Sequence, residues 1–246
     1  MILGDAGRHA AAAVTAIVAV VGLCGCGSST TTSTASSRTA TPTPSPPPTP
    51  TPTAPVAIGT DAVEITATGL GAYLETAVPV AIVHNRTLVD TAQPVTVHFR
   101  VFTASGSEAG DSDTTVARLL PDQTAAITAR VGASASGGHA EAAVTAGSFA
   151  AAPAPALDHV DQVMVTCSGC GSRSGSGDAT GRLTLAGSGG STRTLQAACY
   201  DAGGALVGGG SEDVGLAGTP EQQVDVPVIL STSAQNCRID VFAQGF

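Results

Sequence analysis

The chain of 246 residues has no lysine and no tryptophan, and it has only five phenylalanines and two tyrosines. Charged residues make up 12% of it, about half the usual share. The formal net charge is -9, and binding to phosphates needs clustered cationic side chains, so nucleic acid is not expected as a partner. The 30 glycines and 15 prolines exclude coiled coils and long helical arrays.

The first 25 residues are predicted to be an export signal. Arg8 supplies a weakly positive start, and residues 10–23 form an apolar run without charge. A permanent membrane-spanning helix needs about 20 apolar residues, so this run is too short for one and fits the apolar core of a secretory signal peptide.

The end of this run resembles the lipobox of bacterial lipoproteins, in which a small residue precedes the cysteine that becomes lipidated. Cys26 has Gly25 directly before it and Leu23 three residues before it, whereas Cys24 has the bulky Leu23 directly before it. We therefore predict removal of residues 1–25 and lipidation of Cys26. The resemblance implies a diacylglyceryl thioether, and more than one acyl chain gives a stable membrane anchor.

Residues 26–55 are predicted to be a disordered tether. Their first part is almost all Ser and Thr, and residues 41–55 alternate Pro with Thr or Ser. Such segments form flexible coil followed by semi-rigid polyproline II, and they contain too little apolar surface to fold. A ligand for a Pro-rich recognition domain is the alternative interpretation, and a spacer is favoured.

Two related halves follow, predicted as domains at residues 56–149 and 157–246. Residues 61–69 align with 161–169, and residues 97–106 align with 195–204. Two further matches occur in the same order, so the halves are predicted to be repeats of one unit. The Ala/Pro-rich segment between them is typical of a boundary.

Within each half the hydrophobic period is two. Val95, Val97, Phe99 and Val101 share one face of a predicted strand, with polar side chains between them. Residues 195–199 are expected to alternate in the same way. This pattern predicts half-buried antiparallel strands and negligible helix. The expected fold class is all-β, with two tandem immunoglobulin-like β-sandwiches.

One strand and turn of each half resemble the FxLYD family of small immunoglobulin-like domains, which occur in bacterial surface lipoproteins. Both halves match in part, with Thr103 in place of the motif's Asp and Ala197 in place of its Phe. The matching residues are Phe99, Val101 and Phe102 in the first half and Cys199, Tyr200 and Asp201 in the second. The resemblance implies immunoglobulin-like sandwiches over residues 56–246 and no shared catalytic residues.

Four cysteines lie in the second half, and an even number in an exported protein predicts disulfides. Three pairings are possible. Alternation along the predicted strands places Cys167, Cys199 and Cys237 on inward faces. Their repeat counterparts, Ala67, Val101 and Ala140, are residues that suit a core. We favour a Cys199–Cys237 bridge across the core and a Cys167–Cys170 bridge closing a tight loop.

Other chemistry is possible for these residues and is less favoured. Residues 167–170 follow a predicted strand, whereas a redox Cys-x-x-Cys motif needs a helix N-terminus. A four-cysteine zinc site would normally contain a second Cys-x-x-Cys pair. Acidic residues in two predicted turns could bind Ca²⁺ weakly, although solvated turn residues are the simpler interpretation; they are Glu108, Asp111 and Asp113, and Glu212 and Asp213.

The sequence therefore predicts a lipid-anchored protein at the outer face of the cell membrane that acts as a non-catalytic binding or scaffolding module. No catalytic residue, metal site or cofactor is assigned. The expected partners are the membrane, through Cys26, and another envelope protein. A metal-binding or thiol-redox protein and a passive structural spacer are the alternatives.

Overall fold

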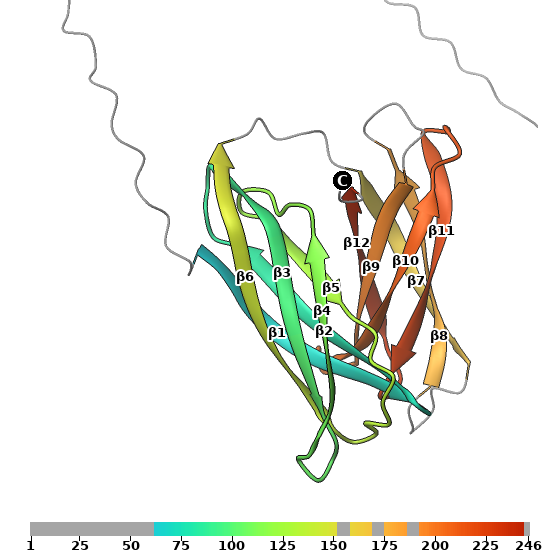
Figure 1. Ribbon diagram of the computed structural model, residues 1–246. Helices are drawn as coiled ribbons and strands as arrows, with labels where there is room; N and C mark the ends of the chain where they lie inside the picture. Colours follow the sequence, from blue (N-terminus) through green and yellow to red (C-terminus); the bar gives the residue numbers. More distant parts are fainter. Residues whose placement is uncertain (1–61, 152–157, 169–174, 186–191, 244–246) are drawn as a thin grey trace, which may run out of the picture. The chain divides into compact units, whose positions relative to one another are not determined.

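The computed structural model describes residues 62–151, 158–168, 175–185 and 192–243 (Figure 1). The predicted signal peptide, Cys26, the tether and Cys170 lie outside these residues. Residues Ala54–Phe246 belong to one compact unit. Within the described ranges, no helix is long and apolar enough to cross a membrane.

The first half contains two three-stranded antiparallel sheets (Figure 1). One has the order β1-β2-β5 and the other the order β4-β3-β6. Their bounds are β1 Val63–Tyr73, β2 Thr76–Asn85, β3 Asp90–Phe102, β4 Glu108–Val116, β5 Thr124–Thr128 and β6 His139–Ala151.

The second half repeats this strand order within one six-stranded sheet, β12-β9-β10-β11-β8-β7. Only two residue pairs, Gly208 with Leu230 and Gly209 with Ile229, join β10 to β11, so the sheet consists of two three-stranded groups. The bounds are β7 His159–Ser168, β8 Gly175–Thr184, β9 Thr192–Tyr200, β10 Leu206–Gly215, β11 Glu221–Leu230 and β12 Asn236–Ala243.

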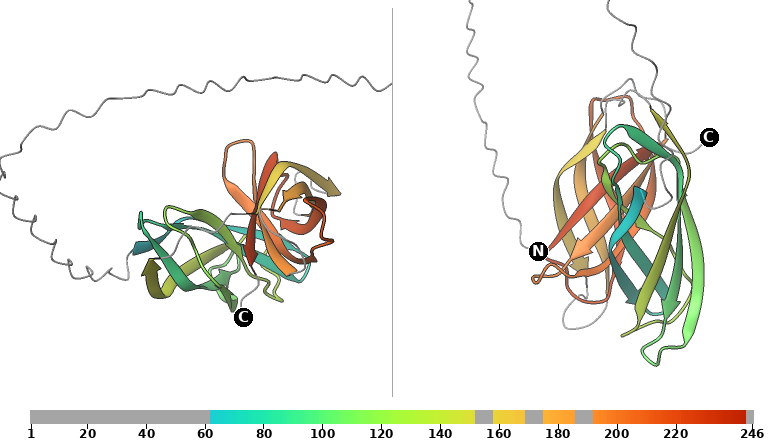
Figure 2. Two further views of the ribbon diagram at one scale, coloured as in Figure 1. Left: turned by 90° about the horizontal axis from the view of Figure 1, so that it is seen from above. Right: turned by 90° about the vertical axis from the view of Figure 1, so that its left-hand side faces the viewer.

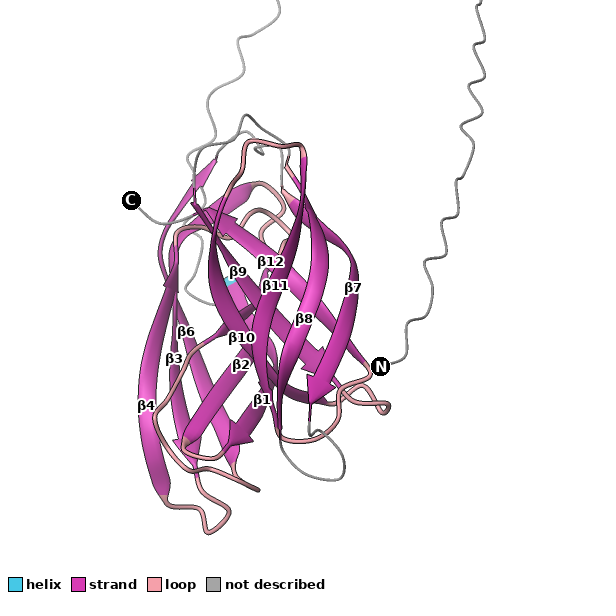
Figure 3. Ribbon diagram, turned by 90° about the vertical axis from the view of Figure 1, so that its right-hand side faces the viewer, coloured by secondary structure: helices cyan, strands magenta, loops and turns pink. Residues whose placement is uncertain are grey.

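The aligned segments of the sequence therefore correspond to equivalent strands in the two halves. The described part of the chain consists of strands and their connections (Figure 3). The all-β, sandwich-type fold is confirmed. Because both halves belong to one compact unit, the division into two domains stays a prediction.

The first half follows the predicted alternation closely. Val95, Val97, Phe99 and Val101 are all fully buried in the sandwich interior. His98 and Arg100, on the opposite face of β3, pair with acidic residues at the surface. The hydrogen bond that Arg100 donates to the Glu108 carboxylate raises the pKa of Arg100 further above its already high value. This face is therefore a solvated, charged surface.

Strand β9 departs from the prediction, because both of its faces are buried. Gln196 and Ala198 are as inaccessible as Leu195, Ala197 and Cys199, which lie in the core of the second half. The reason is that the first half covers the outer face of β9 (Figure 2). One apolar cluster spans both halves and contains Val78, Val80, Ile82, Ala126 and Ala198, with Tyr200, Leu206 and Ile229 packed against it.

Glycines allow the backbones of the two halves to come close. A Cβ atom on Gly71 of β1 would overlap the carbonyl oxygen of Ile229 in β11. Gly208 of β10 has a φ of 148° and faces the same carbonyl group and Gly71. The Gly-rich segment of β10 therefore serves close packing, since glycine tolerates both this φ value and this proximity.

Side chains of the second half cover the outer edge of β5. Asp240 accepts a hydrogen bond from Ala126 N at 2.7 Å, and Gln196 accepts one from Thr128 N. Arg238 donates to the carbonyl oxygen of Thr124 at 2.8 Å. An unpaired strand edge exposes such groups to pairing with other chains. Here the edge of the first half is completed by the second, so the halves depend on each other.

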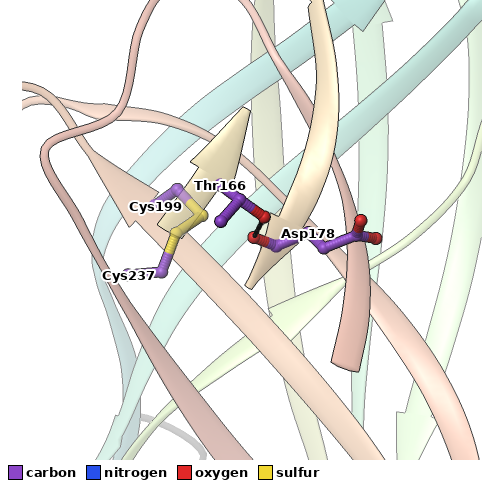
Figure 4. Close-up of a disulfide and its surroundings, with 4 residues drawn as sticks. All are labelled: Thr166, Asp178, Cys199 and Cys237. Atoms are coloured by element: carbon purple, nitrogen blue, oxygen red, sulfur yellow. Dashed lines mark hydrogen bonds between the residues drawn. A yellow bond between two sulfur atoms is a disulfide. The ribbon is translucent and has the colours of Figure 1, made fainter. Parts of the chain in front are cut away.

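The Cys199–Cys237 disulfide is present, with a Cα–Cα distance of 4.0 Å (Figure 4). It links directly opposed residues of neighbouring strands β9 and β12. The predicted Cys199–Cys237 pairing is confirmed, but the bridge joins neighbouring strands of one sheet instead of crossing the core. In the first half the equivalent opposed pair is Val101 and Ala140, both buried. The disulfide thus takes the place of an apolar cross-strand contact.

Candidate functional site

A cavity of about 640 Å³ lies where the two halves meet. Its walls come from β4, the end of β5, β9, β10 and Phe242 of β12. Ligand cavities commonly measure about 300–1,000 Å³. Since both halves contribute to the walls, the cavity exists only because they pack together.

The buried floor of the cavity is uncharged: Val116, Ala129 and Phe242 are apolar, and Thr128 and Gln196 are polar. Thr128 and Gln196 face each other across the junction, and each is 2% exposed. The hydroxyl group of Thr128 has no hydrogen-bond partner among the described residues. Gln196 uses its amide oxygen on Thr128 N, and its amide nitrogen bonds to no described residue. A buried polar group without a partner is costly, so the floor has unused hydrogen-bonding capacity.

The rim of the cavity is charged and exposed. Asp113 on β4 pairs with His98, with 2.7 Å between Oδ1 and Nδ1. Asp213 on β10 accepts a hydrogen bond from Thr194 at 2.6 Å. Arg130 and Glu212 also line the cavity, and neither forms an ion pair with a described residue. The rim therefore presents one free guanidinium group and one free carboxylate.

A smaller cavity of about 140 Å³ adjoins the first and shares four of its residues: Ala129, Arg130, Ser211 and Glu212. Its other walls include Val78 and Ile229, from opposite sides of the apolar cluster between the halves. Arg130 and Glu212 thus border both spaces.

The acidic residues predicted to lie in two turns all lie on strands instead. Glu108, Asp111 and Asp113 belong to β4, and Glu212 and Asp213 belong to β10. The structure brings Asp113, Glu212 and Asp213 to one cavity, whereas Glu108 forms an ion pair with Arg100. Across the described ranges, no group of three or more His, Cys, Asp or Glu residues is placed to hold a metal ion.

Two further hollows are lined mainly by the second half, and most of their charged side chains form ion pairs with described residues. One of about 460 Å³ lies between β7 and β12. There Arg238 pairs with Asp240, and Asp158 with Arg193. The other, of about 400 Å³, lies on the outer face of β7, β8 and β11, where Arg182 pairs with Glu221. The cavity between the halves therefore remains the strongest candidate site.

The cysteines are engaged in disulfides where the structure describes them. Cys199 and Cys237 pair with each other, and Cys167 is also disulfide-bonded. Cys170, its predicted partner, is outside the described ranges. Sulfur atoms in disulfides do not ligate zinc as thiolates, so the described cysteines favour a structural role.

Sequence reasoning missed the residues of the cavity floor. Alternation along residues 195–199 predicts a solvated face for Gln196, and no motif singles out Thr128 or Arg130 as a site residue. One signal was available: residues 195–199, Leu-Gln-Ala-Ala-Cys, contain adjacent small apolar residues instead of strict alternation. Such runs are typical of strands buried on both faces.

No family model and no curated protein matches the chain. Solved structures resemble it weakly. They include a glycosyl hydrolase family 2 member from Bacteroides cellulosilyticus (9% identity, 65% of this chain, 24% of that chain, TM-score 0.27). Another is a red sea bream transglutaminase (10% identity, 74% of this chain, 29% of that chain, TM-score 0.26). The chain spans less than a third of the length of either protein, and scores this low carry no argument about function.

Proposed function

We propose that the chain is a lipid-anchored, non-catalytic binding or scaffolding module at the outer face of the cell membrane. The thioether at Cys26 would hold it there, and residues 26–55 would act as the spacer. The FxLYD-like motif residues support an immunoglobulin-like module of the kind found in surface lipoproteins. The observation that carries the binding role is the cavity between the halves, with its unpaired Thr128 hydroxyl and free rim charges.

Binding fits these residues better than a purely mechanical role. A passive spacer would not need a cavity of about 640 Å³ in which a buried hydroxyl group, that of Thr128, has no partner among the described residues. Such a group reduces stability, so its retention calls for an explanation, and a bound ligand supplies one. The thiol-redox alternative is not favoured, because Cys167, Cys199 and Cys237 are all in disulfides.

Site-directed photo-crosslinking in intact membranes tests the binding role. A photoreactive side chain replaces Ser211 at the cavity, and a matched one replaces the exposed Asp178 on β8, away from the cavity. We expect a discrete adduct from position 211 and none from position 178. Equal labelling at both positions, or none at either, would support the spacer instead.

Metabolic labelling with a fatty-acid analogue tests the anchor. We expect label in the wild type and none in Cys26→Ala. Equal labelling of both proteins would contradict lipidation at Cys26.

A further inference from the structure

The cavity between the halves has a chemistry that selects among ligand classes. Its buried floor carries no charge, with Thr128 and Gln196 as the polar residues among apolar ones, and its charged residues stand at the exposed rim. We propose that it binds a neutral, hydroxyl-rich ligand, namely a saccharide. This inference rests on the proposed binding function and names the ligand class for the same site.

The floor accounts for the ligand being neutral. A carboxylate or ammonium group placed against Thr128 and Gln196 would lose its water and gain no opposite charge there, which is strongly unfavourable. A hydroxyl group can donate and accept at the same time. Its oxygen therefore complements the amide nitrogen of Gln196, which bonds to no described residue.

The rim accounts for the ligand having several hydroxyl groups. Arg130 offers a fork of donors, and Glu212 offers two acceptor oxygens. Neighbouring hydroxyl groups of a sugar satisfy both kinds of group. Three carboxylates against one arginine disfavour an anionic ligand, and they are Asp113, Glu212 and Asp213.

The walls disfavour an apolar ligand. Most of the lining residues carry hydroxyl, amide or charged groups, and the aromatic residue among them, Phe242, is 5% exposed and packs into the core of the first half. Since no exposed ring is available among the lining residues for stacking on a sugar face, we expect weak binding, with dissociation constants on the order of 1 mM.

Saturation-transfer NMR on the full chain, extracted from membranes in detergent, tests this proposal. The probes are glucose, galactose, mannose and N-acetylglucosamine, with glycylglycine, choline and inorganic phosphate as the zwitterionic, cationic and anionic comparisons. We expect saturable transfer to at least one sugar and none to the three charged probes. Binding of a charged probe alone, or of none of the probes, would overturn the saccharide proposal.

Variants locate the binding. Arg130→Ala and Glu212→Gln should each weaken it about tenfold, the usual effect of losing a hydrogen bond to a charged group. Both residues are exposed and free of ion pairs with described residues, so folding should be unaffected. The matched controls Arg118→Ala and Glu75→Gln, also exposed, should bind like the wild type. Equal binding by all four variants would place the sugar elsewhere and overturn the proposal.

The crosslinking result separates the two proposals. An adduct at position 211 without sugar binding would reject the saccharide and leave the binding function in place. Absence of both would reject the two together.

Discussion

Replacing Gly71 by alanine tests directly whether the two halves touch as described. Gly71 lies on β1, and a Cβ atom there would overlap the carbonyl oxygen of Ile229 on β11. A backbone carbonyl group cannot rotate away as a flexible side chain can. The added methyl group must therefore push the strands of the two halves apart.

The cost follows from this overlap. Overpacking by one methyl group commonly costs about 1–3 kcal/mol, and an obstacle in the backbone places Gly71→Ala near the upper end, at about 3 kcal/mol. In a chain of this size each kcal/mol lowers Tm by about 2–4 °C, so we expect a fall of roughly 6–12 °C.

Urea and thermal unfolding of the full chain, followed by far-UV circular dichroism, measure this effect. Gly132→Ala is the matched control, because a Cβ atom there meets nothing within 4 Å. It should change the free energy of unfolding by less than about 0.5 kcal/mol. If Gly71→Ala unfolds at the wild-type midpoint, the packing of β1 on β11 is refuted.

Three further changes probe the same junction and the disulfide. Burial raises the pKa of Tyr200, so the folded chain keeps a phenol proton that the unfolded chain loses; the resulting stability is complete below about pH 10 and is lost as the pH rises through the folded pKa. Tyr200→Phe should therefore reduce the loss of stability above about pH 10 in unfolding measured from pH 8 to 11.5, and an unchanged profile would contradict this. Asp240→Ala leaves the buried Ala126 amide without its acceptor and should lower the free energy of unfolding by about 1–3 kcal/mol. The control Asp225→Ala, at an exposed position, should lower it by less than about 0.5 kcal/mol. Equal effects of the two variants in urea unfolding would contradict the covering of the β5 edge by the second half. Replacing Cys199 and Cys237 by alanine opens a loop with a sequence separation of 38 and should lower the free energy of unfolding by about 4 kcal/mol. Because the variant has no bridge between these positions, reducing agent should cause no further loss there. A double variant as stable as the oxidised wild type would contradict this prediction.

The sequence predicted what local periodicity and repetition encode. The inward positions 95, 97, 99 and 101 follow from simple alternation, and all four side chains are buried. The repeat alignment correctly made Cys199 and Cys237 the equivalents of Val101 and Ala140, which lie opposite each other, and this made the disulfide predictable. These features depend on neighbours along one strand or on one repeat.

The packing of one half on the other was not predicted, because it depends on contacts between distant segments. Strand β2 is buried on both faces, and Val78, Val80 and Ile82 form the face that packs against the second half. Alternation along the strand does not show which partner covers this face. The glycines of β10 allow close approach to β1 and β2, which no pattern within β10 itself encodes. The cavity floor shares this origin, since Thr128 and Gln196 meet only after the halves pack.

Amide hydrogen exchange at Ala126 and Thr128 tests the central claim most directly. These two amides lie on the outer edge of β5, and their acceptors, Asp240 and Gln196, belong to the second half. If the halves form one unit, both amides should exchange about as slowly as the core amides of β3 when followed by NMR on the labelled full chain. Exchange at rates near those of an unfolded chain would show that the edge is open, and the junction, its cavity and its ligand would then lose their structural basis.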